Sequence, residues 1–263
     1  MLVPAGRHVA RAASSTWLGT VNNLWPIDGN WSATPVPGSG DTATFSNAGG
    51  PLDTIDLGPG ITLGAMLFDT AAVDPYVIGA GGVNAQTLTL NNGGTITIAA
   101  TVANGETINA AIVLGTDATA QAYTLTNNSA AATLAVAGSV VGGSGGTAGA
   151  KTLNIAGVGA TSLSGIIGNG GAGSLGITKT GAGTLTLWGA NTFNGAIAVN
   201  GGTLKAGITS VTNTSGAFGR NSAVTLANTA GVILDISGFD TQIGSLAGGG
   251  ASGGNVSLGA NTL

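Results

Sequence analysis

The chain lacks cysteine altogether, and charged and aromatic residues are scarce. It has 263 residues, of which 6% are charged and 4% aromatic, with six Lys and Arg, ten Asp and Glu and one His. Without cysteine there are no disulfides and no thiolate metal sites. One histidine, His8, supports neither a zinc site nor a Ser–His–Asp triad. Six scattered basic residues leave no footprint for a nucleic-acid phosphate track.

Long apolar runs are also missing, since no stretch approaches the eighteen or so residues of a membrane helix. The chain is nevertheless 43% hydrophobic, which is enough for a core, and 49 of its residues are glycine. Glycine breaks helices and favours tight turns. A thin aliphatic core with many turns predicts an all-β protein built from many short strands.

Short alternating runs recur along the chain from Gln86 onward. Runs such as "QTLTL", "TITIA", "KTLNIAG" and "GTLTLWG" alternate apolar residues with Thr, Ser or Asn, and Asn-Gly or Gly-Gly breaks separate them. Alternation of this kind indicates strands with one buried face. The runs echo one another loosely, which favours a solenoid in which each coil packs on the next. With about three strands per coil we expect about five coils from Gln86 and one or two before it.

The N-terminal part has a different composition. Residues 17–50 hold three of the four tryptophans, Trp17, Trp25 and Trp31. Because an open solenoid end exposes core and unpaired backbone, we interpret residues 17–50 as a cap. Residues 1–16 resemble a leader or the remnant of a signal peptide without its apolar region. Residues 51–263 are predicted to form the solenoid, and its last strand-like run, "NVSLGANTL", suggests a C-terminal truncation.

One segment matches a known repeat. "KTGAGTLTLWGANTFNGAIAVNGGTLKAG", residues 179–207, resembles the autotransporter-associated β-strand repeat, which reads roughly K-x-G-x-G-T-L-x-L-S-G-x-N-x-Y-x-G-x-x-x-V-x-x-G-T-L. Trp188 replaces the usual Ser and Phe193 the usual Tyr. "LDISGFDTQIGSL" is similar to a second motif of such proteins, L-D-L-x-G-x-x-Q-x-I-G-S-L. The consensus positions that the segment keeps are Lys179, Gly181, Gly183, Thr184, Leu185, Leu187, Gly189, Asn191, Gly195, Val199, Gly202, Thr203 and Leu204.

The resemblance implies a right-handed parallel β-helix that is secreted or displayed on a bacterial cell surface. It implies a structural or adhesive role without catalysis, no cofactor, and partners such as surface glycans or matrix. Because the exposed ends of the strand ladders carry few charges to oppose stacking, we also expect copies of the chain to associate end to end into fibres. A polysaccharide-binding or polysaccharide-processing β-helix is the alternative. Processing requires clustered carboxylates. No acidic residue lies between Asp117 and Asp235, so such a site is restricted to the N-terminal coils or to the region of Asp235 and Asp240.

Two surface features remain open on sequence alone. Trp188 either faces outward, as a contact surface or a platform for a sugar, or fills a corner of a coil. Thr-x-Thr pairs would form an ice-binding array if they stacked in register, although Thr is also an ordinary outward strand residue. The five pairs are Thr42/Thr44, Thr87/Thr89, Thr95/Thr97, Thr124/Thr126 and Thr184/Thr186.

Overall fold

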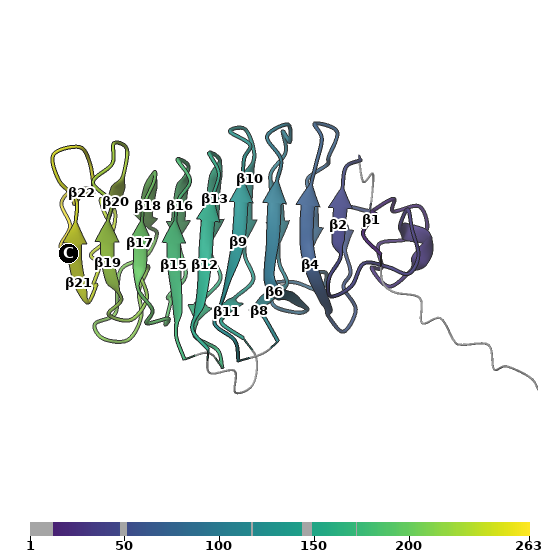
Figure 1. Ribbon diagram of the computed structural model, residues 1–263, viewed down its shortest axis with the longest axis horizontal. Coiled ribbons are helices and arrows are strands. Elements are labelled where there is room, and N and C mark those ends of the chain that lie inside the picture. Colours follow the sequence, from purple (N-terminus) through teal and green to yellow (C-terminus); the bar gives the residue numbers. More distant parts are fainter. Residues whose placement is uncertain (1–12, 48–51, 117, 144–148, 172) are drawn as a thin grey trace, which may run out of the picture.

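The protein is an all-β parallel solenoid of about eight turns, elongated along the axis on which the coils stack (Figure 1). The computed structural model describes residues 13–47, 52–116, 118–143, 149–171 and 173–263. All ladders between its strands are parallel, as expected when each coil adds one strand to each sheet. A 3-10 turn, η1 (Asp28–Asn30), lies in the N-terminal segment.

The larger sheet, called sheet 1, runs the length of the molecule. Neighbouring strands along its path come from successive coils. In order they are β1 (Ser15–Thr16), β2 (Thr42–Phe45), β4 (Ile61–Phe68), β6 (Thr87–Ile98), β9 (Gln121–Asn127), β12 (Lys151–Ala156), β15 (Leu175–Lys179), β17 (Ile197–Val199), β19 (Ala223–Leu226) and β21 (Ser245–Gly248).

The second sheet, called sheet 2, follows sheet 1 in each coil. Its strands are β3 (Thr54–Ile55), β5 (Val77–Ile78), β7 (Glu106–Ile108), β10 (Thr133–Val136), β13 (Ala160–Leu163), β16 (Thr184–Leu187), β18 (Thr203–Ala206), β20 (Ile233–Asp235) and β22 (Asn255–Ser257).

A third row of strands gives the middle coils a third side. It comprises β8 (Ala111–Leu114), β11 (Val140–Val141) and β14 (Ile167–Gly168), and it joins sheet 1 where β8 pairs with the first half of β6. The prediction of three strands per coil therefore holds for these coils, whereas loops take the place of the third strand after β16, β18 and β20.

Coil length is irregular, which is why the sequence suggested fewer turns than the structure has. In sheet 1, Thr124 pairs with Asn154 thirty positions on, whereas Thr178 pairs with Ala198 after twenty. Alternating side chains point into one continuous core of Leu, Ile, Val and Phe. Each additional coil buries its apolar face on the previous coil, so the strands depend on stacking rather than on local propensity.

The tryptophan-rich segment lies against the first coils at the N-terminal end (Figure 1). Trp17, Trp25 and Trp31 are at most 4% exposed, and their rings meet edge to face at centroid separations of 5.1 and 4.6 Å. Phe45 of β2 contacts all three. The segment thus covers the apolar end of the solenoid.

The predicted leader, residues 1–16, falls mostly outside the described residues. Ser15 and Thr16, the last two residues of the predicted leader, form β1 and pair with Ala43 and Thr44 in sheet 1.

Candidate functional site

Trp188 lies on the outer face, just after β16. Inward residues of that strand are Leu185 and Leu187, so the alternation directs Trp188 outward with Thr184 and Thr186. It is 48% exposed, whereas the other three tryptophans are buried. The outward alternative left open by the sequence is therefore the one that the structure adopts.

Gly207 and Phe239 fix the position of the indole. Leu187 pairs with Ala206 of the next coil, so Trp188 lies beside Gly207. A Cβ at Gly207 would come within 2.5 Å of the indole Cδ2, so the ring rests directly on this glycine. Phe239, one coil further on, meets the indole edge to face with 6.4 Å between ring centroids and 78° between ring planes.

An ion pair borders this aromatic pair. Lys205 of β18 pairs in register with Asp235 of β20, and Nζ lies 3.5 Å from the carboxylate Oδ2. Lys205 lies two positions before Gly207, and Asp235 lies two positions before Ser237, which is beside Gly207 in the next coil. Both side chains therefore belong to the same outer face as Trp188, about 6.6 Å away along the strands. The backbone N–H of Ser237 donates to Asp235 Oδ1 at 2.9 Å.

The acid–base properties of Asp235 reflect these contacts. Partial burial raises the pKa of its carboxyl, but hydrogen bonds from Ser237 and the charge of Lys205 outweigh this and leave the pKa below its usual value. Asp235 is therefore a carboxylate at neutral pH, held beside a cation. We call Trp188, Phe239, Lys205, Asp235 and Ser237 the aromatic platform.

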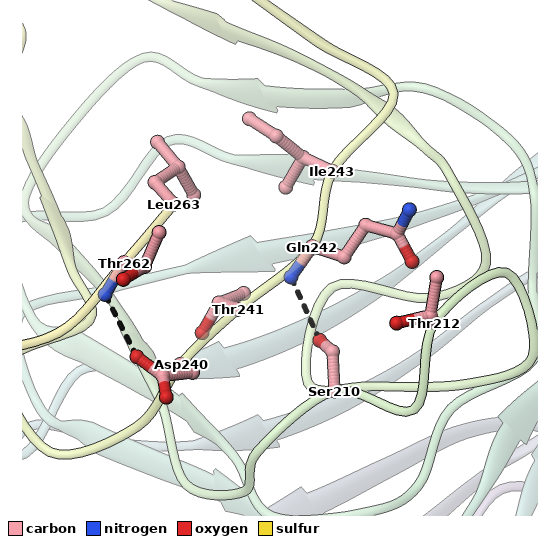
Figure 2. Close-up of a pocket in the computed structure, with 8 residues that line it drawn as sticks. All are labelled: Ser210, Thr212, Asp240, Thr241, Gln242, Ile243, Thr262 and Leu263. Carbon is pink, nitrogen blue, oxygen red and sulfur yellow. Dashed lines mark hydrogen bonds between the residues drawn. The ribbon is translucent and has the colours of Figure 1, made fainter.

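A hollow of about 410 Å³ opens in the loops that follow β18, β20 and β22 (Figure 2). Its polar groups largely satisfy one another: Gln242 N–H donates to Ser210 Oγ at 2.9 Å, and Thr262 N–H donates to Asp240 Oδ1 at 2.8 Å. Asp240 directly follows Phe239 in the chain. The hollow is lined by Ser210, Thr212, Asp240, Thr241, Gln242, Ile243, Thr262 and Leu263.

Carboxylates do come together in the N-terminal coils, and one of them, Glu106, is buried while Asp53 and Asp74 are partly exposed. Thr54, Val77 and Thr107 pair in successive coils, so the residues that precede them, Asp53, Tyr76 and Glu106, are stacked as well. Glu106 is fully buried. Its Oε2 accepts the backbone N–H of Tyr76 at 2.8 Å, and its Oε1 has no hydrogen-bond partner among the described residues.

Burial controls the titration of this acidic cluster. Desolvation raises the pKa of Glu106 to about 8, with further increases from Asp74 and Asp53, against a lowering by the Tyr76 N–H. Desolvation, together with Asp74, also raises the pKa of Asp53. Glu106 is consequently a neutral acid at pH 7. Sequence reasoning did not single it out, because only the stacking of coils buries it.

Two lysines, Lys151 and Lys179, are buried instead of solvated. Lys179, the first residue of the repeat motif, lies in the inward row of sheet 1 between Ile155 and Val199. Its ammonium donates to the carbonyls of Gly181 at 2.6 Å and Gly201 at 2.9 Å. Desolvation lowers its pKa to about 8. Lys179 joins two loops of successive coils, which gives a physical reason for lysine at this motif position.

The threonine pairs form no extended array. Thr95 and Thr97 stack on Thr124 and Thr126, but the next coil places Asn154 and Ala156 beside them. The other three pairs do not stack on further pairs. The stacking of threonine pairs thus stops after two coils, whereas an ice-binding face requires a regular array over many coils.

Neither a metal centre nor a membrane helix is found in the part of the chain that the structure describes. Those residues contain no group of three or more His, Cys, Asp or Glu arranged to hold a metal ion. They also contain no helix with the length and hydropathy of a membrane span.

The stacked sheets, together with the hydrogen bonds from Lys179 to the glycine carbonyls of two successive loops, define a repeat protein of the parallel β-solenoid class. Residues 177–206 match the family described as Passenger-associated-transport-repeat. This match runs from β15 to β18 and so includes one strand of each sheet from two successive coils. Residues 177–206 of this chain are therefore similar to an autotransporter-associated repeat, as the motif indicated.

A curated relative extends this likeness. The adhesin BmaC autotransporter of Brucella suis biovar 1 is 52% identical over 87 residues, which are 33% of this chain and 2% of that protein. The matched part is thus a small fraction of the relative's length. No solved structure matches the chain.

Proposed function

We propose that the chain is part of an extracellular, non-catalytic adhesive scaffold of the autotransporter-passenger type, secreted or held at a bacterial cell surface. The observation that carries this proposal is the 52% identity over 87 residues to an autotransporter adhesin. The parallel solenoid supports it, because stacked coils form a stiff rod that holds a surface away from its attachment point.

The outer face of sheet 1 suits a contact role rather than catalysis. One outward row reads Thr95, Thr124, Asn154, Thr178 and Ala198 across five coils. These side chains are small and uncharged, so a partner meets a flat face without charges that must be desolvated. In the acidic cluster the central carboxyl, Glu106, is closed to solvent.

Adhesion is tested with the purified chain on beads. Beads carrying the folded chain should be retained on cultured cell layers or on matrix-coated surfaces, and beads carrying the heat-unfolded chain should not. Equal retention of both would contradict an adhesive role of the folded surface. A hydrolase and lyase screen on polysaccharides should show no turnover by the chain.

Polysaccharide binding is the second candidate function, and the aromatic platform favours it. A sugar ring has an apolar face, which can stack on the exposed indole of Trp188. Its hydroxyls lie at the edge of the ring, where Lys205 can donate and Asp235 can accept hydrogen bonds. The alternative does not need catalysis, and it is compatible with an adhesive scaffold.

Self-association end to end is a further part of the proposal. The tryptophan-rich segment acts as a cap at one end, whereas β21 and β22 at the other end are exposed, with Leu246 and Leu258 more than 40% accessible. Unpaired edges of this kind promote strand-to-strand association. Sedimentation of the 263-residue chain should show concentration-dependent dimers that Leu246→Lys abolishes, and a strict monomer at high concentration would argue against stacking.

A further inference from the structure

The aromatic platform combines features that the solenoid fold does not require. In the repeat consensus the position of Trp188 is usually Ser, and the position of Phe239 in the second motif is variable. Trp188 is not needed to fill the core, since it is 48% exposed and the inward residues beside it, Leu187 and Ala206, already close the coil, whereas Phe239 is partly buried and packs against the core. A large exposed ring on a surface otherwise made of small polar side chains therefore marks a contact site.

The platform is also held in place before any ligand arrives. The indole rests on Gly207, which has no side chain to lift it, and Phe239 contacts it edge to face. Little side-chain entropy is lost when a ligand stacks on a ring already fixed in this way.

Charge decides what kind of ligand fits. Lys205 and Asp235 form an ion pair on the same face as the indole. The pair supplies donors and acceptors within one or two sugar units of the ring, but its net charge is zero. It can therefore bind vicinal hydroxyls, and it offers no net attraction to an anionic or a cationic chain.

We infer that Trp188, with Phe239, Lys205 and Asp235, binds an uncharged pyranose glycan whose apolar ring face stacks on the exposed indole. This inference rests on the proposed adhesive function and names the chemistry of one contact within it. The site is shallow, so the affinity for a single sugar unit is low. Repeated contacts along a polysaccharide, or along many copies of the protein, raise the overall avidity.

The fluorescence of the chain offers a direct assay. Trp17, Trp25 and Trp31 are buried in the N-terminal coils, so quenching by acrylamide reports Trp188. We would titrate the 263-residue chain with β-glucan, with galactomannan and with asialo N-glycans released from a mammalian glycoprotein. These arms separate a microbial or plant source from a host source. Anionic alginate serves as the charged comparison.

The expected result is protection of Trp188 from acrylamide by at least one neutral glycan, and no protection by alginate. In affinity electrophoresis, which does not depend on the indole, Trp188→Ala should weaken binding at least about tenfold. Trp188→Phe should retain part of it. The double variant Lys205→Ala/Asp235→Ala should weaken binding while its indole remains in place.

Val83→Ala is the matched control, because Val83 is 53% exposed in a distant coil. Its binding should equal that of the unchanged chain, and all variants should keep the same unfolding midpoint. The inference is overturned if no neutral glycan protects Trp188, if Trp188→Ala binds as the unchanged chain does, or if only alginate binds.

The bead experiment separates this inference from the proposed function. If beads carrying Trp188→Ala adhere as well as the unchanged chain and neither binds neutral glycans, the glycan site is refuted and the adhesive scaffold stands. If the unchanged chain binds glycans through Trp188 but its beads do not adhere, the adhesive function is refuted and the site stands.

Discussion

Replacing Glu106 by glutamine should stabilise the protein, and the gain should depend on pH. The glutamine side chain retains the acceptor for the Tyr76 N–H and has nearly the same shape, but it cannot ionise. In the unfolded chain a Glu has its ordinary pKa, 4.5, whereas in the folded protein the pKa of Glu106 is raised to about 8. Below pH 4.5 the carboxyl is protonated in both states, so the substitution should have little effect there.

Between these two pKa values the unfolded state releases a proton that the folded state keeps. Each pH unit in this range lowers the free energy of unfolding by about 1.4 kcal/mol. At pH 7 the accumulated loss is about 3 kcal/mol, and it stops growing near pH 8, where the folded protein ionises as well. Glu106→Gln should therefore be about 3 kcal/mol more stable than the unchanged chain at pH 7, and about equal to it at pH 4.

Urea unfolding at pH 4, 5, 6, 7 and 8 measures this difference. Circular dichroism follows the whole solenoid, and the buried tryptophans report the N-terminal coils near Glu106. Asp28→Asn is the control, because Asp28 is exposed and its side chain forms no hydrogen bond or ion pair with the described residues. A stability difference that stays constant from pH 4 to pH 8, or a less stable Glu106→Gln at pH 7, would refute the assignment of Glu106 as a buried neutral acid.

Three further substitutions test other parts of the structure. Folding lowers the pKa of Lys179 from 10.5 to about 8, so between these values the unfolded chain binds a proton that the folded protein does not, and stability rises with pH. Lys179→Met should abolish this gain in stability, and thermal melts across the same pH range measure it. Asn191→Ala should lower the free energy of unfolding by about 2 to 4 kcal/mol, since it leaves a buried backbone N–H and a carbonyl without partners; exposed Asn128→Ala should change the urea midpoint little. Gly207→Ala should lift the indole of Trp188 and increase its quenching by acrylamide; unchanged quenching would contradict the packing of the ring on this glycine.

The class of fold follows from the sequence with little ambiguity. Alternating Thr and Leu or Ile in runs such as Thr184–Leu187 can bury only one face, and the frequent Gly and Asn-Gly breaks exclude long helices. The short runs also resemble one another loosely along the sequence, which favours coils stacked along an axis. The repeat motif was also readable directly, because its glycines and its Lys179 occupy fixed positions along two successive coils.

The neighbours of each residue were decided only by the tertiary structure. Coils hold between twenty and thirty residues in sheet 1, so no fixed period tells which residue lies beside which. Trp188 and Phe239 are 51 positions apart and meet only because two coils of unequal length separate them. The burial of Glu106 and Lys179 has the same origin: a polar side chain in an alternating strand faces inward or outward according to register, and the loops between the strands set that register.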